Sequence, residues 1–224
     1  MEIENLPILS HLESDFFSTL RQKGRIKEFE KGSTPIDAEA TTKYFYIILE
    51  GRLKVSQINP QNAKEQTIQI LTTGDMFDII PLLDGKPHEV LATAIDNCRV
   101  FETDISAIRE LIYTNPEFNR LFMPYIAKHL RSLENLAVEL SLFDTSTRLM
   151  RLFLKNLDLK SSSKLKLIHD LPHEEIASLI GTVRHVVNRH IQQLKKEGIL
   201  QVERKRLTLK NLEALLEKLP IKSS

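Results

Sequence analysis

The spacing of apolar residues changes twice along the chain. Between residues 25 and 103 they gather in short runs rich in β-branched and aromatic residues, which predicts strands separated by turns. Between residues 116 and 142 they recur every three or four positions, which predicts one long helix. Shorter helical patterns and two strand-like runs follow it. We therefore expect an N-terminal domain with flanking helices at 1–115, a long helix at 116–143 and a C-terminal domain at 144–224.

The first part predicts a small β-barrel or roll, since short strands at this spacing are typical of such folds. Turn pairs such as Glu50-Gly51, Asn59-Pro60 and Thr73-Gly74 separate its runs. One or two helices are expected at residues 6–23, and Asp104 is expected to cap the helix after the last strand. The expected strands are 25–30, 43–51, 52–58, 66–71, 90–95 and 99–103.

Asn115-Pro116 marks the start of the long helix, since proline is acceptable in a first helical turn. Its apolar residues keep a seam near 3.5 residues per repeat, and such a seam needs a partner. The β-domain could supply one, but a long helix between two domains more often pairs with its copy, so we expect a homodimer. The residues expected in the dimer helix seam are Phe122, Ile126, His129, Leu133, Leu136 and Leu140.

Residues 171–200 predict two short amphipathic helices with a glycine between them, which indicates a helix-turn-helix. Gly181 stands where the chain must turn sharply with a positive φ, and Ala177 is small enough to let the helices approach closely. The faces expected to be buried carry Ile176, Ala177 and Ile180 in the first helix and Val183, Val187, Ile191 and Leu194 in the second.

The opposite face of the second helix carries polar residues that suit the reading of double-stranded DNA. Arginine can chelate guanine, asparagine can pair with adenine, and a helix fits the major groove. An ordinary solvated face is the alternative, which the glycine, the small residue and the long second helix together disfavour. The expected base-reading residues are Arg184, His185, Asn188 and Arg189, with Thr182 and Gln192 on the DNA backbone.

The run LQVERKRLTL at residues 200–209 predicts two strands joined by a tight basic turn, as in a wing. Arg204, Lys205 and Arg206 of this turn are expected to meet phosphates, which position a duplex without reading its sequence. Asp144 or Ser146 is expected to cap the helix before the motif. A polar linker, KSSSK, is expected after that helix, and a final helix, NLEALLEKL, is expected to close the domain.

The distribution of charged residues supports the division between the N-terminal and C-terminal parts. Up to residue 143 the chain has 15 Lys and Arg against 21 Asp and Glu, and from residue 144 it has 16 against 9. A basic C-terminal part indicates a phosphate-binding module, and the acidic N-terminal part attached to it is not expected to bind phosphate. Because no run of eighteen apolar residues and no signal-like N-terminus occurs, we expect a cytoplasmic protein without a membrane partner. The single cysteine, Cys98, excludes a disulfide or an all-cysteine metal site within one chain.

The sequence does not indicate an enzyme. No nucleophile-base pair, metal-spaced set or phosphate loop stands out. His169, Asp170 and His173 flank a helix start, where an exposed polar cluster is the default. The alternative to a DNA-binding protein is a ligand-binding module whose helical C-terminus contacts a protein partner.

The order of these parts, with EEIASLIG and then R..V.R..Q.LKKEGIL, resembles the Crp/Fnr family of bacterial transcription regulators. YFYIILEGRLKV and LTTGDMF resemble the β-roll of cyclic-nucleotide-binding-like domains, so the resemblance covers nearly the whole chain. It implies the α+β class, with an antiparallel β-roll (double-stranded β-helix), a long dimerisation helix and a winged helix-turn-helix. It also implies a homodimer on an inverted-repeat operator, a signal sensed in the β-roll, and RNA polymerase as a further partner.

The helix-turn-helix departs from the family pattern at three positions. Members that read the common half-site carry a glutamate where this chain has His185, so the operator is expected to differ. Pro172 stands where a Ser or Thr cap is usual, and His190 stands at a normally apolar position.

The sensor part departs further. Cyclic-nucleotide binders of the family have Gly-Glu where this chain has Asp78-Ile79, and Arg-Ser or Arg-Thr where it has His88-Glu89. An acidic residue repels a phosphate and no arginine is left to neutralise it, so cyclic AMP is not expected as the effector. The N-terminal cysteines of the oxygen-sensing branch are missing too, so no iron–sulfur cluster is expected.

The effector is therefore open. An apolar group at the GDMF stretch and the long helix could form a pocket, although ordinary core is the favoured alternative. Some family members that sense nitric oxide or carbon monoxide hold haem in this region, so haem is a candidate cofactor, with His88, His129 or His11 as axial ligand. The expected pocket residues are Met76, Phe77, Ile79, Ile80, His88, Phe122, Met123 and Ile126, with Leu82 and Leu83 beside them.

Overall fold

The computed structural model describes Leu20 and residues 22–158, 161–203 and 206–219. These residues form two compact units. The first contains the chain up to Gln57 together with Ile68–Leu133, and the second contains Ile58–Thr67 together with the chain from Glu134. The expected α+β class is confirmed, because strands and helices both build each unit.

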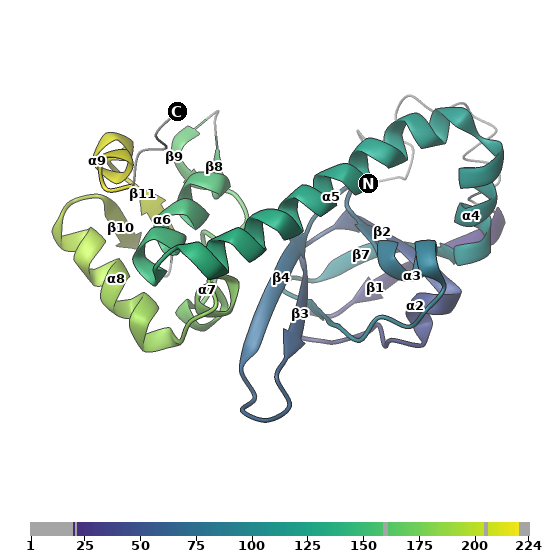
Figure 1. Ribbon diagram of the computed structural model, residues 1–224, viewed down its shortest axis with the longest axis horizontal. Helices are drawn as coiled ribbons and strands as arrows, with labels where there is room; N and C mark the ends of the chain where they lie inside the picture. The colour runs from purple at the N-terminus through teal and green to yellow at the C-terminus, as the bar shows by residue number, and fades with distance from the viewer. Residues whose placement is uncertain (1–19, 21, 159–160, 204–205, 220–224) are drawn as a thin grey trace. The chain divides into compact units, whose positions relative to one another are not determined.

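The first unit is an antiparallel β-roll with strand orders β1-β7-β2-β5 and β4-β3-β6 (Figure 1). Every expected strand forms, and the short strand β5 was not predicted. Two residues are too few to produce a recognisable alternation of apolar and polar positions. The strands are β1 (Gly24–Phe29), β2 (Tyr44–Glu50), β3 (Leu53–Ile58), β4 (Glu65–Leu71), β5 (Met76–Phe77), β6 (Leu91–Ala94) and β7 (Cys98–Asp104).

Strand β2 is buried on both faces, which explains its unbroken apolar run. Phe45, Ile47 and Leu49 pack into one core cluster together with residues of the helices. Tyr46 and Ile48 point the other way, into the cluster that fills the roll. Successive side chains of a strand leave opposite faces, so this one strand joins the two halves of the core.

The helices named around the roll, within the described residues, are α2 (Ala40–Lys43), α3 (Ile79–Asp84), α4 (Ile105–Thr114) and α5 (Pro116–Leu142). Asp104 precedes α4 as expected, but its side chain makes no cap hydrogen bond, so that prediction was wrong. Asn115 instead caps α5, because its Oδ1 accepts from the backbone N–H of Phe118 at 2.8 Å. The expected helix at residues 6–23 falls largely outside the described residues.

Helix α5 buries part of the face expected to form the dimer seam in the core of its own unit. Phe122 is fully buried in the core of its own unit, so it was wrong as a seam residue. Ile126 packs against the same cluster but is only partly buried, so its place in the seam stays a prediction. Within the first unit, Met123, Leu130 and Leu133 are the large apolar side chains that α5 leaves exposed. Their spacings of seven and three residues define an exposed stripe that shares only Leu133 with the expected seam.

The second unit is built on a sheet with the order β10-β11-β9-β8, flanked by helices. Asp144 is the cap of α6, since its Oδ1 accepts from the backbone N–H of Thr147 at 2.8 Å. The expected polar linker KSSSK is instead mostly strand β9, because its backbone pairs with β8 and β11 although its side chains are not apolar. The elements are α6 (Thr145–Asn156), β8 (Leu157–Asp158), β9 (Ser161–Leu165), α7 (His173–Leu179), α8 (Arg184–Lys196), β10 (Leu200–Glu203), β11 (Arg206–Leu209) and α9 (Leu212–Glu217).

Candidate nucleic-acid interface

Helices α7 and α8 form the expected helix-turn-helix. Pro172 precedes α7 without a side-chain cap bond, as its missing donor and acceptor require. Val183 was wrong as a buried residue, because it is the extended residue before α8 and is 46% exposed. Helical spacing does not govern a residue outside the helix. The other residues expected on the inner faces are buried: Ile176, Ala177, Ile180, Val187, Ile191 and Leu194.

The turn between the helices depends on Gly181, whose φ is +66°. A Cβ at this position would lie 2.6 Å from Leu140 Cδ2, so the residue is constrained both by its backbone and by its neighbour. Leu140 is partly buried and lies close to this turn within its own unit, and its expected place in the dimer seam stays a prediction. Arg148 stabilises the same turn, because its guanidinium donates to the carbonyl oxygen of Ile180 at 2.7 Å.

The polar face of α8 is open. All five side chains expected to read or contact DNA from this helix are exposed, and the opposite face of the helix is buried. Burial lowers the pKa of His173, the first residue of α7. His190 is half-buried and its Nε2 lies 3.0 Å from the hydroxyl of Thr145, so a polar contact accounts for a histidine at an apolar position. The exposed residues are Arg184, His185, Asn188, Arg189 and Gln192.

The wing forms as expected. Strands β10 and β11 pair antiparallel from Leu200 with Leu209 to Glu203 with Arg206. Arg206 is exposed at the end of this hairpin, whereas Arg204 and Lys205 lie outside the described residues.

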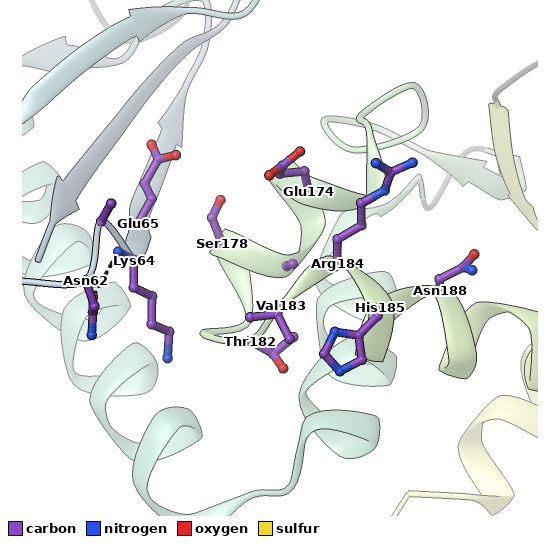
Figure 2. A pocket seen from close by; sticks show the side chains of 12 residues that line it. Asn62, Lys64, Glu65, Glu174, Ser178, Thr182, Val183, Arg184, His185 and Asn188 are labelled. Atoms are coloured by element: carbon purple, nitrogen blue, oxygen red, sulfur yellow. Dashed lines mark hydrogen bonds between the residues drawn. The ribbon is translucent and has the colours of Figure 1, made fainter.

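A hollow lies beside the start of the recognition helix α8 (Figure 2). One wall is the segment that joins β3 to β4, and we call residues 58–67 the hairpin tip. The sequence predicted a turn in this segment. It did not predict that the segment packs beside the helix-turn-helix, because a contact between residues distant in sequence leaves no local pattern. The lining residues are Asn62, Ala63, Lys64 and Glu65 of the hairpin tip and Glu174, Ala177, Ser178, Thr182, Val183, Arg184, His185 and Asn188 of the helix-turn-helix.

The residues expected to form an effector pocket do not come together as one group. Met76, Ile79, Phe122 and Ile126 belong to the core cluster under α4 and α5, so ordinary core accounts for them. Phe77 faces the interior of the roll, because neighbouring residues of β5 point to opposite sides. Ile80, Leu83 and Met123 are exposed instead, and Leu82 is buried.

A polar pair occupies the sensor region. His88 Nδ1 lies 2.5 Å from Asp78 Oδ2, and both side chains are largely buried. The other oxygen of Asp78 accepts from the backbone N–H of Ile80 at 3.2 Å and so caps α3. Hydrogen bonding to Asp78 raises the pKa of His88 in spite of burial, which acts in the opposite direction.

Of the other two histidines considered as haem ligands, His129 packs its ring 4.4 Å from the ring of Tyr125. Burial lowers the pKa of His129, which favours its neutral form. His11 lies outside the described residues. The ring of His88 is oriented by Asp78, and its Nε2 is the nitrogen that this contact does not use. Haem therefore stays a prediction.

We expect Asp78→Asn to lower the pKa of His88, because the amide can still cap α3 but cannot stabilise a positive imidazole. The raised pKa means that the pair stabilises the fold at pH values below the ordinary pKa of 6.5, and that this contribution is lost as pH rises through the pKa of folded His88. An NMR titration of the histidine ring measures the shift. Glu89→Gln removes a nearby exposed carboxylate as a control, and an equal drop in that variant would contradict the assignment to Asp78.

Comparison with known proteins identifies the two units. Residues 26–115 match the family model of the cyclic nucleotide-binding domain. Residues 147–218 match the model of the Crp-like helix-turn-helix domain. The chain belongs to the Crp/Fnr family of transcription regulators. This Crp/Fnr protein is thus a DNA-binding transcription regulator with an N-terminal effector-binding domain, and not an enzyme.

Relatives cover nearly the full length of this Crp/Fnr regulator. A CRP-like cAMP-activated global transcriptional regulator of Mycobacterium tuberculosis is 26% identical over 93% of this chain and 94% of its own. A global nitrogen regulator of Synechococcus elongatus is 23% identical over 85% of this chain and 88% of its own. Among solved structures, a CooA variant from Carboxydothermus hydrogenoformans has a TM-score of 0.78 at 24% identity, covering 97% of this chain and 96% of its own. This structural similarity supports the fold described above, a β-roll, a long helix and a winged helix-turn-helix.

Two further observations concern the described residues. No helix among them is long and apolar enough to span a membrane. They also contain no cluster of three or more His, Cys, Asp or Glu side chains arranged to hold a metal ion.

Proposed function

We propose that this regulator reads a specific operator through the exposed face of α8. The observation that carries the proposal is the arrangement of Arg184, His185, Asn188 and Arg189, which are all exposed on the side of α8 opposite its buried residues. Arginine and asparagine side chains can make the paired contacts that distinguish bases in the major groove. His185 carries no carboxylate to accept from cytosine, so the half-site differs from the common one of the family.

Phosphate contacts come from residues around this face. Thr182 lies at the positive N-terminal end of α8, where phosphates bind readily, and Gln192 lies one turn beyond Arg189. Arg206, at the end of the wing hairpin, would contact the backbone beside the groove, and Arg204 and Lys205, which lie outside the described residues, are proposed to do the same. Base-reading residues and phosphate-binding residues thus have separate places in the proposed complex.

The proposed regulator is a cytoplasmic homodimer on an inverted repeat, divided into 1–115, 116–143 and 144–224, with RNA polymerase as a further partner. The exposed Met123, Leu130 and Leu133 of α5 support the dimer, because the heptad-like spacing of this stripe fits the packing of two copies. The two recognition helices would then enter successive major grooves about 34 Å apart.

The effector proposed for the β-roll is not a cyclic nucleotide. His88 stands where phosphate-binding members carry arginine, and it is already bound to the carboxylate of Asp78 at 2.5 Å. Asp78 and Glu89 would repel a cyclic phosphate at this place. A small molecule without a phosphate, or haem bound through a histidine, remains the proposed signal.

A binding selection with a salt titration tests the DNA-binding proposal. The full chain is incubated with a pool of random duplexes, and the recovered sequences are compared with the input pool. We expect an enriched inverted repeat, and an affinity for it that falls steeply as salt rises, because phosphate contacts release counterions. Recovery of unselected sequences with an affinity insensitive to salt would favour the alternative of a C-terminal domain that contacts a protein partner.

A further inference from the structure

The hairpin tip contacts the helix-turn-helix within the second unit. The hydroxyl oxygens of Thr67 and Ser178 lie 2.7 Å apart, and both residues are buried. Lys64 donates from Nζ to the carbonyl oxygen of Gly181 at 3.3 Å. The side-chain oxygen of Gln66 lies 2.9 Å from the point that a Cβ on Gly181 would occupy. Three residues of the hairpin tip therefore converge on α7 and on the turn before α8.

The hydroxyl pair has a defined direction. Ser178 donates to the carbonyl oxygen of Glu175 at 2.9 Å, which uses its single hydroxyl proton. The Thr67 hydroxyl is then the donor to Ser178. A hydrogen bond of this kind makes only a small net contribution to stability, because water replaces the partner when the contact opens. The contact is therefore strong enough to bias the position of the hairpin tip and weak enough to be released.

The position of this contact conflicts with a duplex on α8. A helix in a major groove about 12 Å wide has a sugar-phosphate strand on either side of it. The hairpin tip forms the opposite wall of the hollow that Thr182, Arg184 and His185 line (Figure 2). It thus stands beside the N-terminal end of α8, where one phosphate strand must pass, and Glu65 adds a negative charge to that wall.

We propose that the hairpin tip is an internal competitor of DNA, which holds the helix-turn-helix through Thr67 and Lys64 until it is displaced. The inference rests on the DNA-binding function proposed above. Strands β3 and β4, which carry the hairpin tip, continue into the sheet β4-β3-β6 of the effector-binding domain. A signal that shifts these strands would release the contact, so the same element that binds the recognition motif is attached to the sensor.

The first test measures the affinity of the Lys64→Ala and Thr67→Val variants for a duplex recovered from the random pool by the unmodified chain or by a variant. We expect both to bind about three- to tenfold more tightly than the unmodified protein, because one competing hydrogen bond is lost. Lys86→Ala removes a lysine that is exposed on the first unit and serves as the charge-matched control. An increase in the affinity of Lys64→Ala for DNA would point to the lost contact, since removing a positive charge by itself weakens DNA binding. Weaker binding by Lys64→Ala with an unchanged control would overturn the inference and make Lys64 a phosphate contact.

The second test locks the hairpin tip. Thr67→Cys and Ser178→Cys are combined in a Cys98→Ser background, which removes the only native cysteine. Oxygens 2.7 Å apart place the replacing sulfurs within reach of a disulfide of about 2.05 Å. Oxidation should form the bond within one chain and abolish binding to the selected duplex, and reduction should restore it. The Cys98→Ser protein alone, treated with the same oxidant, should keep its binding.

Four outcomes would count against the competitor. A double-cysteine protein that forms no internal bond shows that the hairpin tip does not occupy this place. A bonded protein that still binds the duplex shows that the contact does not compete. If neither the unmodified chain nor any variant binds any duplex, the proposed DNA-binding function is wrong and the inference fails with it. If the protein binds a duplex but Lys64→Ala and Thr67→Val bind it no more tightly than Lys86→Ala does, only the competitor role is refuted.

Discussion

The Arg189→Ala variant is expected to lose most of its preference for the operator over random duplex. Arg189 is exposed on the face of α8 opposite the buried Val187, Ile191 and Leu194. A bidentate arginine-guanine pair is worth about 1–3 kcal/mol, so the operator affinity should fall roughly 10- to 100-fold. Affinity for random duplex should fall only a little, because the other phosphate contacts remain. Fluorescence anisotropy with the selected operator and a scrambled duplex measures both affinities.

Lys210→Ala is the matched control for this variant. Lys210 is an exposed residue of the same unit that lies outside α8, so its removal changes the net charge equally. We expect similar small losses on both duplexes and an unchanged ratio between them. Equal losses on both duplexes in Arg189→Ala as well would mean that Arg189 binds phosphate and that another residue of α8 reads the base.

The Gly51→Ala variant is expected to lose about 2–5 kcal/mol of folding stability, from positive-φ strain and from steric overlap together. Gly51 lies between β2 and β3 with a φ of +88°. A Cβ there would lie 2.7 Å from the carbonyl oxygen of Asn97 and 3.0 Å from Cα of Cys98, which are backbone atoms that cannot move aside independently. Urea denaturation followed by circular dichroism measures the free energy of unfolding.

Gly74→Ala separates the two causes. Gly74 has nearly the same φ, +89°, but a Cβ there would meet nothing within 4 Å. Only the backbone strain applies, so the loss should be about 1–2 kcal/mol. A loss in Gly51→Ala no larger than in Gly74→Ala would show that the turn relaxes away from Asn97 and that the close approach is unimportant.

The sequence by itself determined the order and kind of the main elements. Strand-like runs, the helical spacing of residues 116–142 and the glycine between two amphipathic segments each report local periodicity, and periodicity is retained in any tertiary arrangement. The polar face of α8 followed from the same spacing, because residues three and four apart share a face. The departures at His88-Glu89 and His185 were likewise visible as residue types alone.

Only the tertiary structure decided which apolar face of a helix is buried and which elements it packs against. Helix α5 has apolar residues on more than one side, and only packing against β2 and α4 assigned Phe118 and Phe122 to the core and left Met123 and Leu130 exposed. Strand β9 depends on backbone pairing with β8 and β11. Its polar sequence gives no alternation of apolar and polar residues from which that pairing could be predicted. In both places the deciding partner is distant in sequence.

The same limit applies to two polar contacts between side chains, one in the sensor region and one at the hairpin tip. Asp78 and His88 stand ten residues apart, and the fold of the segment around α3 brings them within 2.5 Å. Thr67 and Ser178 are separated by 111 residues, so no local pattern could pair them. The sequence determined that this chain has an amphipathic helix with an exposed polar face, α8, because that pattern is local. Only the tertiary structure decided that the hairpin tip lies against α7 and the turn before α8, because such a contact depends on long-range packing.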